Sequence, residues 1–591
     1  MDSNKRLILT VGISLAIFLG YQWTMTTFFP APAPHPTAST EIKEAPGSGD
    51  VVPALHERSA DEAGNEGDAV PAGDEGTVVA AALPQREVTL RTDDLLLGFS
   101  SHGAGLFKAE LLGRKGQRQG GTDAPQVDLA GALQPSDPLL FEATTGEGLP
   151  VLGNRAPCSV AGSDERSVTF LCDAPGLQLE KKFTVTGART LDLQMVLHNR
   201  GAVPLAGTLG LLMPARVDPA RQVSSRGCAG FGGAPPQPTQ NICRADDKIS
   251  RSLYHADKPS VTPEGRAWFA GIEERYFLAV AVPDQASACE LVAETPEFLT
   301  THLNTKVATI APGASQTVRY QLVIGPKDIG LLQDASASIA SSTGLPNPKL
   351  DETVDLGFWA VIARILLWLL RAAHHVIANW GVAIILLTVA VKLLTLPLAW
   401  KSMKSMEEMR KLAPEIAKLK EKFGSDREKL NLETMKLYQQ HKVNPLGGCL
   451  PMLIQMPIWL ALYATLQTSV ELYNEPFIAG WISDLTSKDP YYALPLAMGV
   501  TMYITQKMQP MQMEAAQQKV MLYFMPIFFT FIMLQLPAGL TLYIFTNNLL
   551  SIGQQMALRK SMGIPAIGAP PPAASSATIE VAPAKKPGKK K

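Results

Sequence analysis

Hydrophobic and polar positions divide the chain into three kinds of segment. A continuous apolar run extends from Leu7 to Phe29, and at about 1.5 Å per residue it is long enough to cross a hydrocarbon core of about 30 Å. From Glu87 to Gly325, short runs such as Leu177–Val185 alternate apolar and polar residues and are separated by Gly, Pro, Asn and Asp. After Leu356 the apolar segments become long again. The pattern predicts a membrane anchor, an antiparallel β-sandwich and a helical membrane bundle.

These patterns predict an order of domains along the chain. We expect a transmembrane anchor at 1–29, a flexible Pro/Ala/Gly-rich linker at 30–83, a β-sandwich domain at 84–345, an interfacial amphipathic helix at 356–377, a five-span core at 378–558 that includes a helical hairpin at 401–442, and a basic tail at 559–591. The predicted fold is a membrane α-helical bundle, one N-terminal anchor plus a five-span core, with an inserted all-β sandwich domain and a helical hairpin.

Charge placement predicts how the chain crosses the membrane. The core spans are expected at 378–398, 447–469, 491–506, 520–536 and 539–557. Lys and Arg gather in 401–442 and in the tail, whereas the loop 470–490 is acidic. By the positive-inside rule, the hairpin and both termini are cytoplasmic and the β-sandwich is exported. A cleaved signal peptide is the alternative for the first run, since Ala31-Pro32-Ala33 imitates a cleavage site, but Pro34 would then begin the mature chain.

Composition and cysteines agree with a membrane protein whose β domain is exported. Of the 591 residues, 46% are hydrophobic, and the net charge of −1 gives no global attraction for nucleic acid. Cys158 and Cys172 flank a turn-like segment at equal distances, so a hairpin would bring them within disulfide range. A bond between Cys228 and Cys243 is left open and would make Cys289 an odd thiol. Five buried, reduced cysteines are the alternative.

Lys392 is the residue that stands out in the apolar half. No nucleotide-binding, metalloprotease or serine-hydrolase motif is present in the sequence. Lys392 lies near the middle of the span predicted at 378–398, where a cation in contact with lipid costs about 2.5 kcal/mol or more. No carboxylate in the spans offers a fixed partner. We therefore expect Lys392 to face a hydrated groove and attract an anionic visitor; a lysine that snorkels to the headgroups is the alternative.

Three segments in the apolar half carry a resemblance to a known family. They are 442–459 (KVNPLGGCLPMLIQMPIW), 489–502 (DPYYALPLAMGVTM) and 537–543 (PAGLTLY). Together and in this order they resemble the YidC family of membrane protein insertases. The large domain after the first span resembles the Gram-negative type, in which that domain is periplasmic.

The resemblance implies a site and a set of partners. The five C-terminal spans would form a groove open to cytoplasm and lipid, with Thr388, Lys392, Gln455 and Tyr543 as groove or client-contact residues. The partners would be nascent membrane proteins, membrane lipids and a Sec translocon, in a bacterial inner membrane. Apart from the resemblance, the basic tail and the cytoplasmic loops could meet the ribosome through phosphate contacts with its RNA, and a merely solvated, disordered tail is the alternative. Lys392 departs from the family pattern, which usually has arginine there, so the charge is kept and the bidentate fork is lost.

The resemblance implies a non-covalent insertase and chaperone, with no cofactor, no metal and no enzymatic step. Two other functions remain open. A secondary transporter would suit a lysine inside the membrane, although such proteins normally show two related halves and none is visible here. A membrane-anchored periplasmic enzyme or sugar-binding module would use the β domain, although a sandwich fold alone does not identify a ligand.

Overall fold

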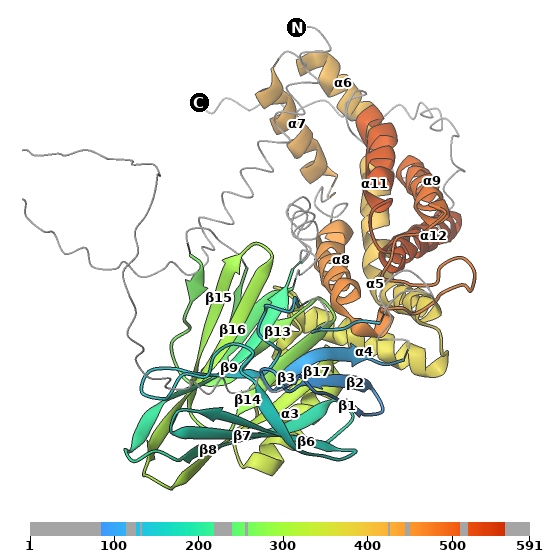
Figure 1. The fold of residues 1–591 in the computed structure, drawn as a ribbon. Helices are drawn as coiled ribbons and strands as arrows, with labels where there is room; N and C mark the ends of the chain where they lie inside the picture. Colours follow the sequence, from blue (N-terminus) through green and yellow to red (C-terminus); the bar gives the residue numbers. More distant parts are fainter. Residues whose placement is uncertain are drawn as a thin grey trace, which may run out of the picture. The chain divides into compact units, whose positions relative to one another are not determined.

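The computed structural model describes residues 84–113, 126–130, 133–217, 239–253, 258–423, 426–441, 443, 450–508 and 518–561. The predicted anchor 1–29, the linker 30–83 and the tail beyond Ser561 lie outside these ranges. The described residues form a β domain, with strands β1 to β17, and a helical part, with helices α4 to α12 (Figure 1).

The strands of the β domain form three antiparallel sheets. Their orders are β1-β2-β3, β11-β10-β13-β14-β17-β8-β7-β6-β5 and β12-β15-β16-β9-β4. The bounds are β1 Glu87–Arg91, β2 Leu95–Ser100, β3 Gly105–Leu111, β4 Glu142–Thr145, β5 Cys158–Ser163, β6 Ser167–Ala174, β7 Leu177–Val185, β8 Thr190–Asn199, β9 Leu205–Arg216, β10 Gln240–Ala245, β11 Lys248–Ser252, β12 Ser260–Val261, β13 Ala267–Glu273, β14 Phe277–Pro283, β15 Ser287–Thr295, β16 Phe298–Ile310 and β17 Ser315–Pro326. The predicted antiparallel arrangement is confirmed.

Period-two alternation places one face of each long strand in the sandwich core. On β8, Leu191, Leu193, Met195 and Leu197 are fully buried, and the residues between them are half-exposed. Successive side chains of a strand point to opposite faces, so this register buries these four apolar residues on one face. The strand β14 differs, because all of its residues are buried. Its second face belongs to the buried cluster that contains Leu332 and Ile339 of α3, Ile329–Thr343.

The helix α3 is capped at both ends. Asp328 is the N-cap, and its carboxylate accepts from the Leu331 amide at 3.1 Å. An Asp at this position satisfies an amide of the first turn that has no partner within the helix. At the other end, Gly344 has a φ of 70°, a left-handed conformation that glycine adopts without strain.

Two disulfides join strands of the β domain. Cys158 on β5 and Cys172 on β6 are bonded, as predicted from the hairpin. Cys243 on β10 is bonded to Cys289 on β15, which corrects the assignment of Cys289 as an odd thiol. The pairing was invisible in the sequence because β10 and β15 belong to different sheets, which only folding brings together. Cys228 lies outside the described residues.

The helical part consists of long helices with short turns between them. The bounds are α4 Ala360–Val376, α5 Trp380–Lys411, α6 Ala413–Phe423, α7 Arg427–Gln440, α8 Leu450–Thr468, α9 Ala493–Met508, α11 Met525–Met533 and α12 Ala538–Ser561, with a π turn at Val520–Phe524 before α11. The helix α12 packs against α5 and α9, and α11 packs against α9 (Figure 1). Over the described residues, one helix, Trp380–Met409, is long and apolar enough to cross a membrane by itself.

Two helices follow α5 in the region of the predicted hairpin. The helix α5 continues past the expected span end at Leu398 to Lys411, although Pro397 removes one hydrogen bond from its backbone. Hydropathy marks where a membrane would end and does not mark where a helix ends. The helices α6 and α7 then follow, and the Asp426 carboxylate caps α7 by accepting from the Lys429 amide at 3.1 Å. The cytoplasmic location of α6 and α7 stays a prediction.

Candidate functional site

Three helices of the bundle bring polar side chains together. The helix α5 carries Lys392, α8 carries Gln455, and α12 carries Tyr543 and Ser551. The helix α12 contacts both α5 and α8, so it is the shared wall between the other two. A polar side chain within an apolar stretch of such a helix needs a hydrogen-bond partner inside the protein or water.

The Lys392 ammonium is held by a hydroxyl group and not by a carboxylate. Its Nζ donates to Ser551 Oγ at 2.8 Å, and Ser551 Oγ donates to the Asn547 carbonyl at 2.7 Å. Lys392 is half-buried and forms no ion pair with any Asp or Glu that the structure describes. A hydroxyl orients the ammonium without neutralising it, so the positive charge remains available to an anionic group.

Polar groups continue along the same face of α12. Tyr543, Asn547 and Ser551 recur every fourth residue and therefore lie one above another on the helix. The Asn547 Oδ1 atom is buried and accepts no hydrogen bond from the described residues. The same holds for Oε1 of Gln555, one turn after Ser551, and of Gln506 on α9. Buried carbonyl oxygens in this state are expected to bind water or a visiting donor.

Gln455 and Tyr543 connect α8 to α12. The Gln455 amide donates to the Tyr543 hydroxyl at 3.2 Å, and Tyr543 is 2% exposed. This contact and the Lys392–Ser551 contact both involve α12. The helix is thus hydrogen-bonded to α8 near its beginning and to α5 near its middle.

Thr388 and Ser551 depart from what the sequence suggested. Thr388 is 1% exposed, and its hydroxyl donates to the carbonyl of Ile384 at 2.7 Å on its own helix. Its hydrogen-bonding capacity as a donor is therefore used within α5. Ser551 was missed, although the spacing of four residues from Asn547 on a polar face was a signal that could have found it. Client contact by Thr388, Lys392, Gln455 or Tyr543 stays a prediction.

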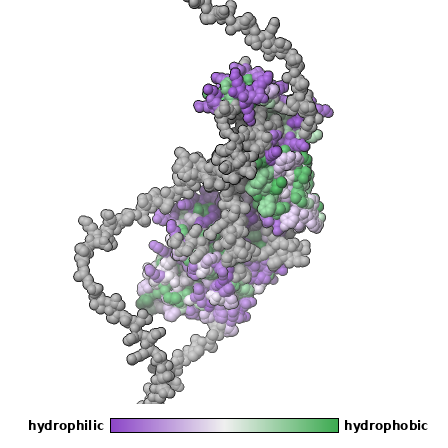
Figure 2. All heavy atoms as spheres, turned by 90° about the horizontal axis from the view of Figure 1, so that it is seen from above, coloured by the Kyte–Doolittle hydropathy of each residue, from purple (hydrophilic) through white to green (hydrophobic). Residues whose placement is uncertain are grey.

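The outer surfaces of α9 and α11 are apolar. Leu496 and Val500 on α9 and Ile527 and Phe531 on α11 are exposed, with Phe531 at 71%. Figure 2 shows hydrophobic side chains gathered in one patch, with hydrophilic side chains above and below it. Exposed apolar surface of this extent is typical of contact with lipid or with another protein.

Two of the apolar helices are short. The helix α9 has 16 residues, and the apolar stretch that includes α11 runs from Val520 to Met533. At 1.5 Å per residue α9 is about 24 Å long, less than a hydrocarbon core of about 30 Å. Both lengths are counted only over the described residues, which exclude 509–517 between these helices, so the thinning of the bilayer expected from the sequence stays a prediction.

Over the described ranges, no three His, Cys, Asp or Glu side chains are placed to hold a metal ion. The arrangement can attract an anion, hydrogen-bond polar groups and expose an apolar surface beside them. These are capacities for non-covalent binding.

Comparisons with known proteins cover nearly the whole described chain. The family model for the 60Kd inner membrane protein matches residues 372–564, and that for the YidC periplasmic domain matches residues 87–369. The membrane protein insertase YidC of Anaeromyxobacter sp. (strain Fw109-5) is 42% identical over 493 residues, which cover 82% of this chain and 86% of that protein. The membrane protein insertase YidC of Geotalea daltonii (strain DSM 22248 / JCM 15807 / FRC-32) is 31% identical over 579 residues, which cover 95% and 99%.

A solved structure also matches. The crystal structure of an active YidC insertase with its first transmembrane domain resolved has 18% identity to this chain and covers 79% of it and 91% of that chain. The TM-score of this match is 0.35.

Proposed function

Because this chain belongs to the YidC family of membrane protein insertases, we propose that it inserts newly made proteins into a bacterial inner membrane through a polar groove beside α5, α8 and α12. The β domain would lie in the periplasm, the hairpin α6–α7 and both termini in the cytoplasm, and six spans would cross the bilayer. The one observation that carries the groove is the Lys392 ammonium, which is oriented by Ser551 without a carboxylate partner among the described residues.

The mechanism we propose is electrostatic and hydrophobic. The polar or acidic end of a client that must be exported enters from the cytoplasm and is held transiently near Lys392. Thinning around α9 and α11 shortens the path that this end must cross. The apolar segment of the client meanwhile slides along the exposed apolar surface of α9 and α11 into lipid.

Lipid burial of the client supplies the driving force in this mechanism. Burying a large apolar side chain is worth about 1.5–3 kcal/mol, and a spanning segment has about 20 predominantly apolar residues. The sum is on the order of tens of kcal/mol, which exceeds the cost of moving one polar end across a thinned layer. Nucleotide hydrolysis by this protein is therefore not required.

The test is charge variation at Lys392. We would reconstitute the full chain with Lys392→Arg, Lys392→Ala or Lys392→Glu into vesicles and measure protease protection of a small client with an acidic exported tail. The control is Lys507→Glu, which makes the same charge change on an exposed side chain of α9 whose ammonium lies over the Tyr503 ring.

We expect Lys392→Arg to insert the acidic-tailed client nearly as efficiently as the wild type, Lys392→Ala to insert it less efficiently, and Lys392→Glu to insert it least efficiently. A charge about 8 Å from a carboxylate interacts with it by about 2 kcal/mol at an effective dielectric constant of about 20. This energy corresponds to a change of about thirtyfold in the equilibrium constant for holding the client's acidic tail. Insertion of a client with a neutral tail should change much less among these Lys392 variants. Normal insertion of the acidic-tailed client by Lys392→Glu would reject the electrostatic step.

The remaining partners stay predictions from the sequence. Contacts with the ribosome through the basic tail and with a Sec translocon involve residues or proteins outside the described structure. Crosslinking from Tyr543 and Lys392 to stalled nascent chains would identify the clients, and loss of crosslinks at both positions would place the client path elsewhere.

A further inference from the structure

The five-stranded sheet of the β domain has a cleft on the face turned away from the sandwich core. Its volume is about 770 Å³, within the range of about 300–1,000 Å³ that is usual for small-molecule sites. On β16, Thr300, His302 and Asn304 line the cleft, whereas Leu303, at the opposite parity, is fully buried in the sandwich core. The cleft therefore lies on the second face of a sheet whose first face is already packed.

The floor of the cleft depends on a glycine. Gly210 on β9 is paired with Asn304 on β16. A Cβ atom at Gly210 would lie 2.6 Å from the Thr144 side chain and 3.1 Å from Asn304 Oδ1. A larger residue would thus occupy the floor, and glycine keeps it open.

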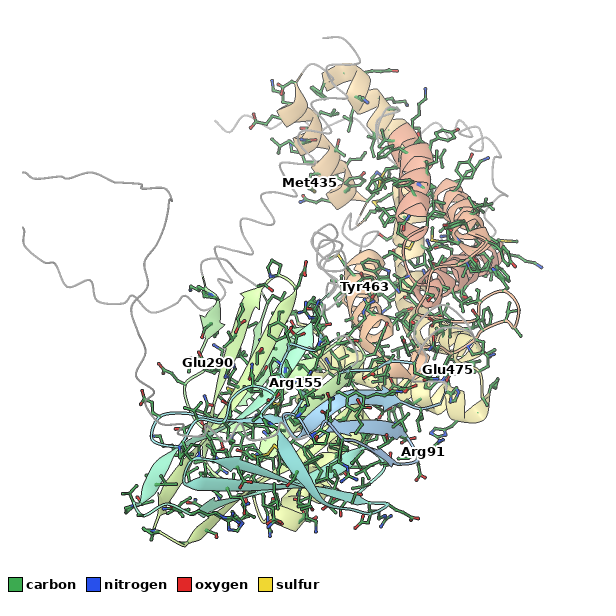
Figure 3. The ribbon with its side chains drawn as sticks, in the orientation of Figure 1. Arg91, Arg155, Glu290, Met435, Tyr463 and Glu475 are labelled. Atoms are coloured by element: carbon green, nitrogen blue, oxygen red, sulfur yellow. A yellow bond between two sulfur atoms is a disulfide. The ribbon has the colours of Figure 1, made fainter. Side chains whose placement is uncertain are left out.

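The rim of the cleft is fixed by charged hydrogen bonds. Arg216 donates from Nε and Nη2 to the two oxygens of Asp137 at 2.6 and 2.9 Å. Arg155, labelled in Figure 3, donates from Nε to the Asp137 carbonyl at 2.7 Å. The Arg216 guanidinium also lies 5.7 Å from the centre of the Phe298 ring. Held on several sides, this rim is preorganised and loses little freedom when a ligand binds.

The walls carry polar groups whose hydrogen-bonding capacity is unused. The ring of His302, the amides of Asn304 and Asn154 and the carboxylate of Glu294 all line the cleft. None of these four side chains donates to or accepts from another group that the structure describes. Together they present both donors and acceptors toward one space.

Charge and shape select the class of ligand. Arg216 and Asp137 neutralise each other, which leaves Glu294 and Glu297 as an excess of negative charge that disfavours phosphate and other anions. Leu212, Phe298 and Pro138 are the apolar lining residues, too few to bury an acyl chain. An extended peptide normally pairs with a free strand edge. The lining strands β9 and β16 are interior and paired on both sides, whereas the edge strand β4 contributes Thr144 and Thr145, so the test includes a peptide.

We propose that this cleft binds a neutral carbohydrate, an activity separate from membrane insertion. Sugar hydroxyls both donate and accept, so they can pair with amides, an imidazole and a carboxylate at once, and the Phe298 ring can pack against the C–H face of a sugar. The volume suits a short oligosaccharide.

The test measures sugar binding by the full chain in phospholipid nanodiscs, by saturation-transfer NMR. Maltoside detergents are avoided because their headgroups are themselves candidate ligands. The probes are maltotriose, cellotriose and tri-N-acetylchitotriose, with the neutral peptide Gly-Ser-Thr-Ser in a separate arm. The cleft variants are Asn304→Leu and His302→Ala. The control is Lys306→Ala, an exposed residue on the same strand and at the same parity but outside the cleft.

At least one trisaccharide is expected to receive saturation from the wild type and from Lys306→Ala, with affinity at least about tenfold lower in both cleft variants. Unfolding temperatures close to that of the wild type would establish that the variants are folded, and two variants are used because one alone could fail to fold. Absence of transfer to all three sugars, or equal transfer in the cleft variants, would overturn the proposal. Cleft-dependent binding of the peptide without any sugar would also overturn it.

Discussion

A buried ion cluster in the β domain supports a sharp stability prediction. The Glu273 side chain is fully buried at the end of β13. Its Oε1 accepts from Arg251 Nε at 2.6 Å and from Gln240 Nε2 at 2.7 Å, and its Oε2 accepts from Lys327 Nζ at 2.8 Å. Replacing Glu273 by Ala removes the acceptor for two cations at once.

The expected cost follows from what remains after the change. Lys327 is 2% exposed at its side chain and would lose this carboxylate as a buried partner, whereas Arg251 is 23% exposed and can turn toward water. Breaking a buried pair by removing one partner costs about 3–5 kcal/mol. Summing three charged hydrogen bonds at about 1.5–3 kcal/mol each would exceed this, but such contributions are not additive.

The assay is thermal unfolding of the full chain, followed by fluorescence, with Glu274→Ala as the matched control. Glu274 is the neighbouring residue and is half-exposed. For a domain of about 150–250 residues, 1 kcal/mol shifts the midpoint by about 2–4 °C, so Glu273→Ala should unfold about 6–20 °C lower. Midpoints for the two variants that agree within about 2 °C would refute the reasoning.

The same cluster predicts how stability depends on pH. Burial by itself would raise the pKa of Glu273, but the charges of Lys327 and Arg251 and their hydrogen bonds outweigh it and lower the pKa below its ordinary value of 4.5. A carboxyl whose pKa is lower in the folded state stabilises the fold fully above pH 4.5, and this stabilisation is lost as the pH falls through the folded value. Glu273→Gln should therefore flatten the loss of stability below pH 4.5, measured as unfolding midpoint against pH.

Three further predictions address the other elements of the structure. Replacing both Cys243 and Cys289 by Ser should cost about 4 kcal/mol on the loop-entropy estimate, since 46 residues separate them. A reductant should then lower the unfolding midpoint of the variant less than that of the wild type, because only the Cys158–Cys172 bond is left to reduce. Ser551→Ala should reduce insertion of an acidic-tailed client less than Lys392→Ala does, because the variant loses one hydrogen bond to a charged group, worth about 1.5–3 kcal/mol, and keeps the charge. Ser551→Thr keeps a hydroxyl and should insert the client as the wild type does. Insertion by Ser551→Thr that is as low as that by Ser551→Ala would separate Ser551 from the role of Lys392. Trp368 on α4 is 67% exposed and should contact lipid. Brominated lipids should therefore quench a component of the wild-type tryptophan fluorescence that Trp368→Phe lacks. Equal quenching in the two proteins would contradict an interfacial α4.

Residue patterns along the chain predicted the local elements well. Period-two runs predicted strands such as β7 and β8, and the apolar segments after Leu356 became helices. Cys158 and Cys172 could be paired from the sequence because they flank one turn. In each case the partners are close along the chain, so a short-range rule was sufficient.

The candidate site was predictable in part. Lys392 was identified as a cation in an apolar span, which is a property of one segment. Its partner Ser551 lies 159 positions away on another helix, and a serine in that helix has many possible contacts. The sequence marked the charge, and the packing of α12 against α5 decided what holds it.

What the sequence determined by itself is the division into an apolar run at the N-terminus, an alternating β region and an apolar helical region, because hydrophobic periodicity is a property of neighbouring residues. It also determined the family. Tertiary structure alone decided that Cys243 pairs with Cys289, that Glu273 gathers two cations, and that the outer face of the five-stranded sheet forms a cleft. Each of these joins residues from separate strands, and their proximity arises only when the sheets pack and fix the register of distant segments.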